Sequence, residues 1–555
     1  MVSLEALWRP RSRWTVLIAA CWVEATAGLS YVFSTYSGAL KSELSYDQRH
    51  INRLSVAKDL GDTVGLAAGL LCRVLPNWAV LSVGALLILG GYGLLWLLTD
   101  HHIPDLPFWL VCILIFIGTN GCTYLDTAAL LACIPNFPSN RATAVGILKG
   151  FKGLCGAIFN QIYASFLSPD ETSFILMLAL GPALVMIPLI IVIGPLSHAE
   201  LLQNEDDDVI FRLLYAAALL LAAYMLSVTL VQDFSSVSNT VNVIFTVVLL
   251  LILLLPLPIP KIADHLSRKR TEDDGSLKDP LLESRVDGSE NGVTSKPTPT
   301  YVAACFMSLT EIREEKTFVE QTAAKGLSKL ELAAADMTLR KAYGSINFWL
   351  LVLCMFFSLG SGTTAFNNLG QMGQSLGYEN TQVFVSMTNI WNFTGRLAGG
   401  YFSELSTRKY GHPRTNMLAI FQLIMAVGHV FYAMAWPGTI YAAVFLVATG
   451  YGAHWAIFPT ALSELFGLQN FGVLYNFVNM ASPAGSLIYS GFIAGPIYDW
   501  QAKKQSSAVI DDTTLSCEGA VCFEVTFFIM AAVCVMGAAL SIVLAFRTRS
   551  LYAIG

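Results

Sequence analysis

Long apolar segments occupy most of this 555-residue chain, and they constrain its fold more than any other feature. About 14 segments each hold roughly 20 predominantly apolar residues, the length that crosses a bilayer as an α-helix. The chain is 55% hydrophobic and only 13% charged, so little sequence remains for a soluble domain. We therefore predict an all-α polytopic membrane protein with about 14 transmembrane helices.

The predicted spans form two groups of six with two additional spans between them. The first group is expected at 14–36, 56–75, 78–98, 107–133, 142–167 and 172–196. The additional spans are expected at 211–232 and 237–257. The last six are expected at 346–366, 381–404, 415–436, 439–464, 471–497 and 522–546.

This layout predicts four parts of the chain. An N-terminal six-helix half covers 1–197, and the two additional helices cover 198–260. A polar segment, 261–342, is rich in Asp, Glu, Lys, Ser and Pro, a composition typical of a largely disordered linker. An amphipathic helix over 307–340 is the alternative for part of it. The C-terminal six-helix half covers 343–555.

Lys and Arg residues near the ends of spans predict the orientation, because cytosolic loops carry an excess of them. An even number of spans places most of these residues on the same side as both termini, which predicts cytosolic termini. The first external loop, with Lys41, Arg49, Arg53 and Lys58, is the exception. Whether the membrane is the plasma membrane or a vacuolar or other internal membrane stays open. The basic residues on the terminal side are Arg9, Arg11, Arg13, Arg141, Arg408, Lys409, Arg414, Arg547 and Arg549.

An internal repeat relates the two halves. The segment 146–151, Gly-Ile-Leu-Lys-Gly-Phe, matches 472–477, Gly-Val-Leu-Tyr-Asn-Phe, and the same offset of 326 continues to Ile162 and Ile488. Membrane proteins built from related halves are typically transporters with a binding site between the halves near the bilayer midplane. The two additional spans are expected to be peripheral to that site.

Several motifs carry a resemblance to a known family. Gly395-Arg396-Leu-Ala-Gly-Gly-Tyr-Phe-Ser-Glu404, followed by Arg408-Lys409, resembles a loop signature of the major facilitator superfamily. Its first-half counterpart, beginning at Gly69, lacks the expected acidic residue. Segments 28–38, 146–156 and 464–472 resemble the plant nodulin-like branch, which includes the nuclear-fusion-defective-four-like proteins.

The resemblance covers nearly the whole chain outside the linker. It implies two six-helix bundles and membrane transport, with no particular substrate. More distantly, the pattern is similar to oxalate/formate and monocarboxylate transporters.

Four ionisable residues lie inside predicted spans at similar depth, which makes them functional candidates. They are Glu24, Asp126, Lys149 and Lys152, and the two lysines share a helix face because they are three residues apart. In the fold that the resemblance implies, their helices line one half of a central cavity. The hypothesis is that Lys149 or Lys152 attracts an anionic substrate while Glu24 or Asp126 exchanges a proton. The alternative is an ion-pair network that only fixes helix packing.

The second half offers Arg396, whose planar guanidinium suits a carboxylate. The spacing from Asn392 to Arg396 resembles a monocarboxylate-carrier helix in which an acid precedes a substrate-binding arginine by four residues. Asn392 replaces that acid here, so proton coupling at this point is in doubt, and Arg396 acting only in gating is the alternative.

The remaining candidates lie on the predicted spans 439–464 and 471–497. His454 is a candidate proton carrier, with a packed structural histidine as the alternative. Pocket-lining candidates on the same two spans are Trp455, Tyr475, Asn476 and Asn479.

Cysteines, cofactors and catalytic groups offer little more. Cys517 and Cys522 lie in an external loop, where they either form a disulfide or remain two free thiols. No Walker loop, zinc spacing or catalytic constellation is present, so neither an enzyme nor a cofactor or metal is predicted. Nothing indicates nucleic acid binding, because no basic stripe occurs.

The sequence thus predicts a secondary transporter of a small organic solute that works by alternating access, with protons as a candidate coupling ion. Lys149, Lys152 and Arg396 favour an organic anion such as a carboxylate. An amino acid or other zwitterion is one alternative. A membrane sensor or scaffold with cytosolic partners at its linker is another.

Overall fold

The computed structural model describes residues 12–46, 48–193, 207–235, 237–263, 265, 337–378, 382–505 and 517–552. Every secondary-structure element in these residues is a helix. Most of the expected linker, including nearly all of the amphipathic helix considered over 307–340, lies outside the described residues.

Eleven helices in these ranges are long and apolar enough to cross a membrane, which agrees with the polytopic fold. The other three predicted spans, 56–75, 381–404 and 471–497, are also mainly helical where described, but they are interrupted or more charged. The count of 14 and the four domain boundaries therefore stay predictions.

The helices of the first half are α1 (Arg13–Glu24), α2 (Phe33–Glu43), α3 (Gln48–Thr63), α4 (Leu66–Val74), α5 (Asn77–Thr99), α6 (Phe108–Cys133), α7 (Arg141–Phe166) and α8 (Glu171–Val192). The additional helices are α9 (Asp207–Phe234) and α10 (Asn239–Leu254). The second half contains α14 (Leu339–Tyr343), α15 (Ile346–Ser375), α16 (Gln382–Tyr410), α17 (Thr415–Met434), α18 (Thr439–Phe466), α19 (Phe471–Asn479), α20 (Ala481–Ser486), α21 (Gly495–Gln505) and α22 (Glu524–Tyr552).

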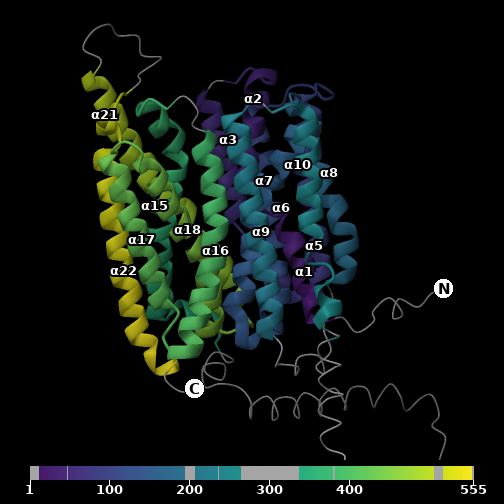
Figure 1. Cartoon of the computed structure of the whole chain (residues 1–555), viewed down its shortest axis with the longest axis vertical. Coiled ribbons are helices and arrows are strands. Elements are labelled where there is room, and N and C mark those ends of the chain that lie inside the picture. Colours follow the sequence, from purple (N-terminus) through teal and green to yellow (C-terminus); the bar gives the residue numbers. More distant parts are fainter. Residues whose placement is uncertain are drawn as a thin grey trace, which may run out of the picture.

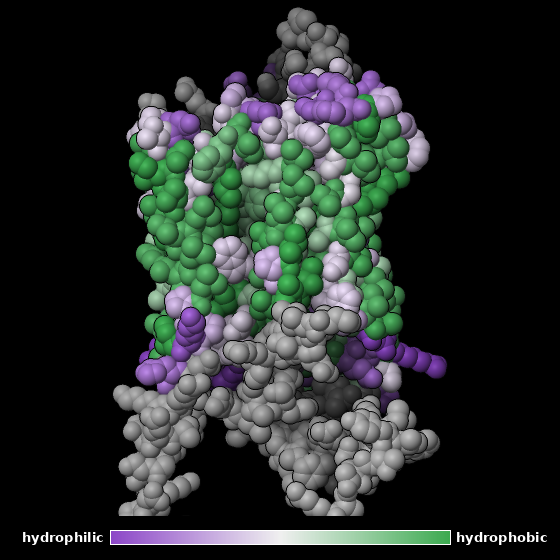
Figure 2. Space-filling model, turned by 90° about the vertical axis from the view of Figure 1, so that its right-hand side faces the viewer, coloured by the Kyte–Doolittle hydropathy of each residue, from purple (hydrophilic) through white to green (hydrophobic). Residues whose placement is uncertain are grey.

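The long helices stand side by side in one bundle (Figure 1), with α15, α17 and α22 on one side, α5 and α8 on the other, and α16 between them. α1 begins and α22 ends at the lower end of this view, which we call the terminal side; α2 and α21 mark the opposite, distal side. Hydrophobic side chains cover the middle of the face seen in Figure 2, and hydrophilic ones gather toward its ends. This belt is the surface that a bilayer requires.

The prediction of one helix over 14–36 is wrong in detail, because α1 ends at Glu24 and a short turn, η2 (Leu29–Val32), separates it from α2. Close packing accompanies the break: a Cβ at Gly28 would collide with the backbone oxygen of Lys152 on α7. The interruption leaves the Glu24 carboxylate at the end of a helix inside the bundle, where it is fully buried.

Two other predicted spans are also divided. Span 56–75 consists of α3 and α4, and α3 begins at Gln48, well before the predicted start. Span 471–497 consists of α19, α20 and a π-helical segment, Leu487–Ala494. Pro483 has no N–H to donate to the carbonyl of Asn479, so regular α-helical bonding is interrupted there.

The two halves approach each other closely at the terminal side. Gly146 on α7 lies against Gly400 on α16, and Gly69 on α4 lies against Gly472 on α19. Small residues let helix backbones meet without an intervening side chain. The terminal side is therefore closed between the halves.

A carboxylate also joins the halves on this side. Glu404 on α16 accepts a hydrogen bond of 3.0 Å from the backbone N–H of Ala142 in the first turn of α7, where the helix dipole favours an anion. Arg414 Nη2 lies 3.2 Å from Glu404 and 2.7 Å from Glu464. Tyr552, at the end of α22, donates to Glu464 over 2.7 Å. One network thus ties α7, α16, α18 and α22 together.

The additional helices contact both halves, and that they are peripheral to the binding site stays a prediction. Asp207 at the start of α9 pairs with Arg13 on α1. The neighbouring Asp208 lies 3.0 Å from Arg408 on α16. Farther along α9, the Tyr215 hydroxyl donates to a backbone carbonyl of α16 over 3.2 Å, and α10 packs against α7.

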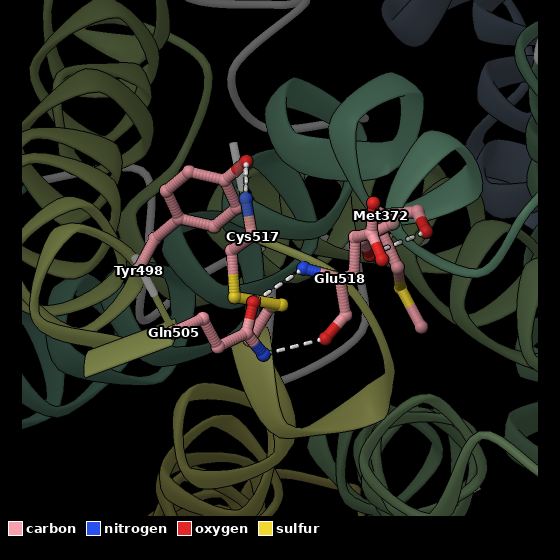
Figure 3. The surroundings of a disulfide bond; sticks show 7 residues. Met372, Tyr498, Gln505, Cys517 and Glu518 are labelled. Atoms are coloured by element: carbon pink, nitrogen blue, oxygen red, sulfur yellow. Dashed lines mark hydrogen bonds between the residues drawn. A yellow bond between two sulfur atoms is a disulfide. The ribbon is translucent and has the colours of Figure 1, made fainter. Parts of the chain in front are cut away.

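On the distal side, Cys517 and Cys522 are joined by a disulfide (Figure 3). The Tyr498 hydroxyl accepts a hydrogen bond of 3.2 Å from the backbone N–H of Cys517. The Gln505 side chain accepts from the N–H of Glu518 over 2.8 Å and donates to its carbonyl over 2.7 Å. These bonds hold the disulfide loop against α21, as Figure 3 shows.

Substituting Gly395 tests the close packing of α16 on α18. A Cβ at Gly395 would collide with the backbone of Thr449, so we expect Gly395→Leu to destabilise the protein by about 1–3 kcal/mol or more. The measurement is the thermal unfolding midpoint in detergent. Gly90→Leu on α5 is the control, because a Cβ at Gly90 meets nothing within 4 Å. Equal midpoints for the two variants would contradict this packing.

Candidate functional site

Lys149 is the centre of a buried polar cluster. Its ammonium donates to the Asp126 carboxylate on α6 and, over 2.6 Å, to the Tyr475 hydroxyl on α19. Tyr475 in turn donates to Asp126 Oδ2 over 2.8 Å. Glu24 Oε1, at the end of α1, lies 3.8 Å from Lys149 Nζ. The cluster therefore connects helices of both halves.

The local sequence explains why these groups pair with one another. On α7, Lys149 is 1% exposed and Lys152 is 8% exposed, so both ammonium groups are surrounded mainly by protein. A buried charge is tolerated only when it is paired and hydrogen-bonded. Asp126 is likewise 1% exposed on α6, and Glu24 is fully buried. The predicted grouping of these four residues is what the structure has.

A carboxylate absent from the predicted site completes this group. Asp62 Oδ1 on α3 lies 3.4 Å from Lys152 Nζ, and Asp126 Oδ2 lies 3.9 Å from the same nitrogen. Asp62 Oδ2 accepts a hydrogen bond of 3.1 Å from Ser30 in the break after α1. The sequence held a signal for Asp62, because it is an ionisable residue inside the predicted span 56–75.

Arg396 is buried on α16 without a carboxylate partner. Its Nε donates to Asn392 Oδ1 over 3.0 Å, Nη1 to the Lys149 carbonyl over 2.7 Å, and Nη2 to the Tyr31 hydroxyl over 2.9 Å. The guanidinium carbon also lies 5.9 Å from the centre of the Trp455 ring. Its hydrogen-bond acceptors are all neutral, and among the described residues the 1%-exposed Arg396 forms no ion pair. Three of its five N–H groups are used, which leaves two for a ligand.

The other predicted pocket residues divide into two sets. Asn479 lies beside the Tyr475 hydroxyl of the cluster, and Asn476 donates to Thr127 on α6 over 2.9 Å, one residue along from Asp126. His454 does not: its Nδ1 lies 2.7 Å from the Gly450 carbonyl one turn earlier on α18, and the side chain is fully buried.

Tyr31 was also missing from the predicted site. A tyrosine in a predicted span gives no signal of its own, because its contact with Arg396 arises only when the break after α1 packs beside α16.

In the described ranges no group of three or more His, Cys, Asp or Glu residues is arranged to hold a metal ion.

The fold and the cluster between its halves define the class of protein. A bacterial homologue of the iron transporter ferroportin, solved in an outward-facing state, has the same fold, with a TM-score of 0.52, 12% identity and coverage of 97% of this chain and 100% of that chain. The MFS-type transporter YhjX of Escherichia coli is 27% identical over 27% of this chain and 38% of its own. This protein has the major facilitator superfamily fold.

Family comparisons narrow the class. The model for nodulin-like proteins matches residues 13–261, and the model described as NFD4, C-terminal domain, matches residues 331–554. Protein NUCLEAR FUSION DEFECTIVE 4 of Arabidopsis thaliana is 27% identical over 98% of this chain and 90% of its own length. The nodulin-like and NFD4 C-terminal models thus match the two halves of this chain, which is similar to nodulin-like proteins over most of its length.

Removing the central cation tests the buried network. Lys149→Met leaves Asp126 and Glu24 without their shared partner, so we expect a loss of about 3–5 kcal/mol of stability, measured by unfolding in mixed micelles. The double variant Lys149→Met/Asp126→Asn should recover part of that loss. Asp208→Asn is the control, because Asp208 and Arg408 form an exposed pair whose loss costs less than about 1 kcal/mol. A Lys149→Met variant as stable as the wild type would contradict the network.

Proposed function

We propose that this protein is a secondary active transporter that moves a small organic anion, a carboxylate, by alternating access coupled to protons. The observation that carries the proposal is Arg396, a buried guanidinium in the seam between the halves whose hydrogen-bond partners are all neutral.

A buried cation without a counter-ion is costly, so the surroundings of Arg396 favour an anionic ligand. A carboxylate fits best, because its two oxygens can accept two parallel N–H bonds from one guanidinium. Asn392 and the Lys149 carbonyl hold two of the guanidinium nitrogens in place. Trp455 provides an aromatic wall that suits the apolar part of a small organic acid.

The carboxylate cluster supports coupling to protons. Arg396 binds the backbone carbonyl of Lys149, and the Lys149 side chain holds Asp126 and Glu24. The ligand site and the candidate proton carriers therefore meet at one residue. When a carboxylate gains or loses an ammonium partner its proton affinity changes strongly, and this is how anion binding can drive proton uptake.

The closed terminal side supports alternating access. With the termini on the cytosolic side, as the basic residues near the ends of spans favour, the contacts Gly146–Gly400 and Gly69–Gly472 seal the cytosolic end. The hydrogen bond from Ala142 to Glu404 belongs to the same seal. Transport then requires that these contacts open while the distal ends of the halves approach.

Uptake by proteoliposomes tests the proposal. The full-length protein is reconstituted and given labelled lactate, malate or glutamate, with and without a proton gradient directed inward. Saturable uptake of lactate or malate that the gradient enhances is the expected result. Uptake of glutamate alone would favour a zwitterion carrier instead. No uptake of any of the three by folded protein would contradict the proposal.

Arg396 variants test the binding site itself. Arg396→Gln keeps hydrogen bonding but removes the charge, so we expect carboxylate uptake to fall by at least about tenfold, which corresponds to about 1.4 kcal/mol or more. Arg396→Lys keeps the charge but lacks the planar, parallel N–H donors of a guanidinium, so it should retain only part of the activity. Arg549→Gln, on the exposed end of α22, is the matched control and should transport normally. Unchanged uptake by Arg396→Gln would exclude this arginine as the anion site.

A further inference from the structure

A continuous line of polar contacts leads from the buried cluster toward the distal side. The Lys152 ammonium nitrogen lies 3.9 Å from Asp126 Oδ2 and 3.4 Å from Asp62 Oδ1, so it links the two carboxylates. Ser30 then donates to Asp62 over 3.1 Å, and the carbonyl of Ser30 accepts from Lys58 over 3.2 Å. Each group is close enough to the next to exchange a hydrogen bond after a side-chain shift of about 1 Å or less.

The carboxylates joined by this line differ in exposure. The side chain of Asp62 is 17% exposed and that of Lys152 is 10% exposed, whereas Asp126 is 2% exposed and Glu24 is fully buried. Asp62 is therefore the carboxylate of this group that water reaches most easily.

The path of α3 relates Asp62 to the two sides of the bundle. α3 runs from the distal side, near α2, toward the terminal side, and Lys58 lies one turn closer to its distal start than Asp62 does. Below Asp62, the contact between Gly69 and Gly472 closes the seam at the terminal side. Because this contact lies between Asp62 and the terminal side, it favours water access to Asp62 from the distal side.

We propose that Asp62 is the group through which the transport site exchanges protons with the distal side, with Lys152 passing them on to Asp126. This inference rests on the proposed function and adds a residue and a direction to it.

The proton step balances with the groups present. Asp62 takes a proton from a hydronium ion on the distal side, which leaves a water molecule, and becomes a neutral carboxylic acid. Lys152 then gives one of its ammonium protons to Asp126 and receives the Asp62 proton in return. The same exchange at Lys149 carries a proton from Asp126 to Glu24. Each lysine ends as it began, and one proton has moved inward without an oxidant or a reductant.

Several groups surround Asp62 and will influence its titration. They lie on α3, α5, α6 and α7, and Lys152 is the cation that contacts Asp62 directly. The titratable and charged neighbours are Lys152 and Cys155 on α7, Asp126 and Cys122 on α6, Tyr92 on α5 and Lys58 on α3 itself.

Asp62→Asn separates proton coupling from substrate movement. In proteoliposomes, an inward gradient of one pH unit should let the wild type accumulate labelled lactate or malate about tenfold per proton. The Asp62→Asn variant should bring the probe only to equal concentrations on the two sides. Exchange of external label for the same unlabelled anion inside needs no net proton movement, so this variant should retain it within about twofold of the wild type.

Two further variants make the test specific. Asp59→Asn makes the same change three residues away on α3, at a carboxylate paired with Lys58, and should accumulate the probe normally. Asp62→Glu restores a carboxylate and should restore accumulation with a shifted pH profile.

The outcomes distinguish this inference from the proposed function. Absence of both uptake and exchange in the wild type would overturn the proposed function and this inference with it. Gradient-driven accumulation by Asp62→Asn would overturn only the role of Asp62. Loss of both accumulation and exchange in Asp62→Asn would assign Asp62 a structural role and would also overturn the inference.

Discussion

The need to neutralise Lys149 inside an apolar bundle determines how several helices meet. An unpaired ammonium in the hydrocarbon region is costly, so the side chain must find acceptors within its reach. It finds Asp126 on α6 and Tyr475 on α19, and the α1 helix ends so that Glu24 comes near. The carbonyl of the same residue accepts a bond from Arg396 on α16. Four other helices thus make polar contacts with one residue of α7.

Local hydropathy is enough to predict the straight helices. It does not predict the interrupted helices, because their breaks depend on contacts between distant parts of the chain. The span expected at 107–133 agrees with α6 within a residue, because each turn of such a helix meets either lipid or the apolar core. The break after Glu24 depends on how Gly28 approaches α7, a contact between residues far apart in the chain. The start of α3 was missed because its first turns are polar, and only packing against α6 makes them part of the bundle.

The same contrast between local sequence and tertiary contacts applies to the candidate site. Charge inside predicted spans was sufficient to select Lys149, Lys152 and Asp126, since a buried charge has few explanations. The same criterion covered Asp62, but its importance depends on Ser30 and Lys152, which the sequence places far from it. For His454 the residue type alone suggested chemistry, whereas the structure gives it a bond within its own helix. Which ionisable group acts is decided by its partners, and partners are a property of the tertiary fold.

Lys149 and Tyr475 are separated by 326 residues, the offset of the internal repeat, and they are hydrogen-bonded to each other. Residues on a symmetry axis meet their own counterparts, so these two lie at the axis that relates the halves. A duplicated ancestor with two identical halves would have placed two ammonium groups there, and their repulsion at low dielectric would oppose assembly. At this position the two halves therefore cannot both carry a lysine. The neutral hydroxyl of Tyr475 lets the equivalent positions meet as a hydrogen-bonded pair, so a difference between the halves is what allows them to touch here.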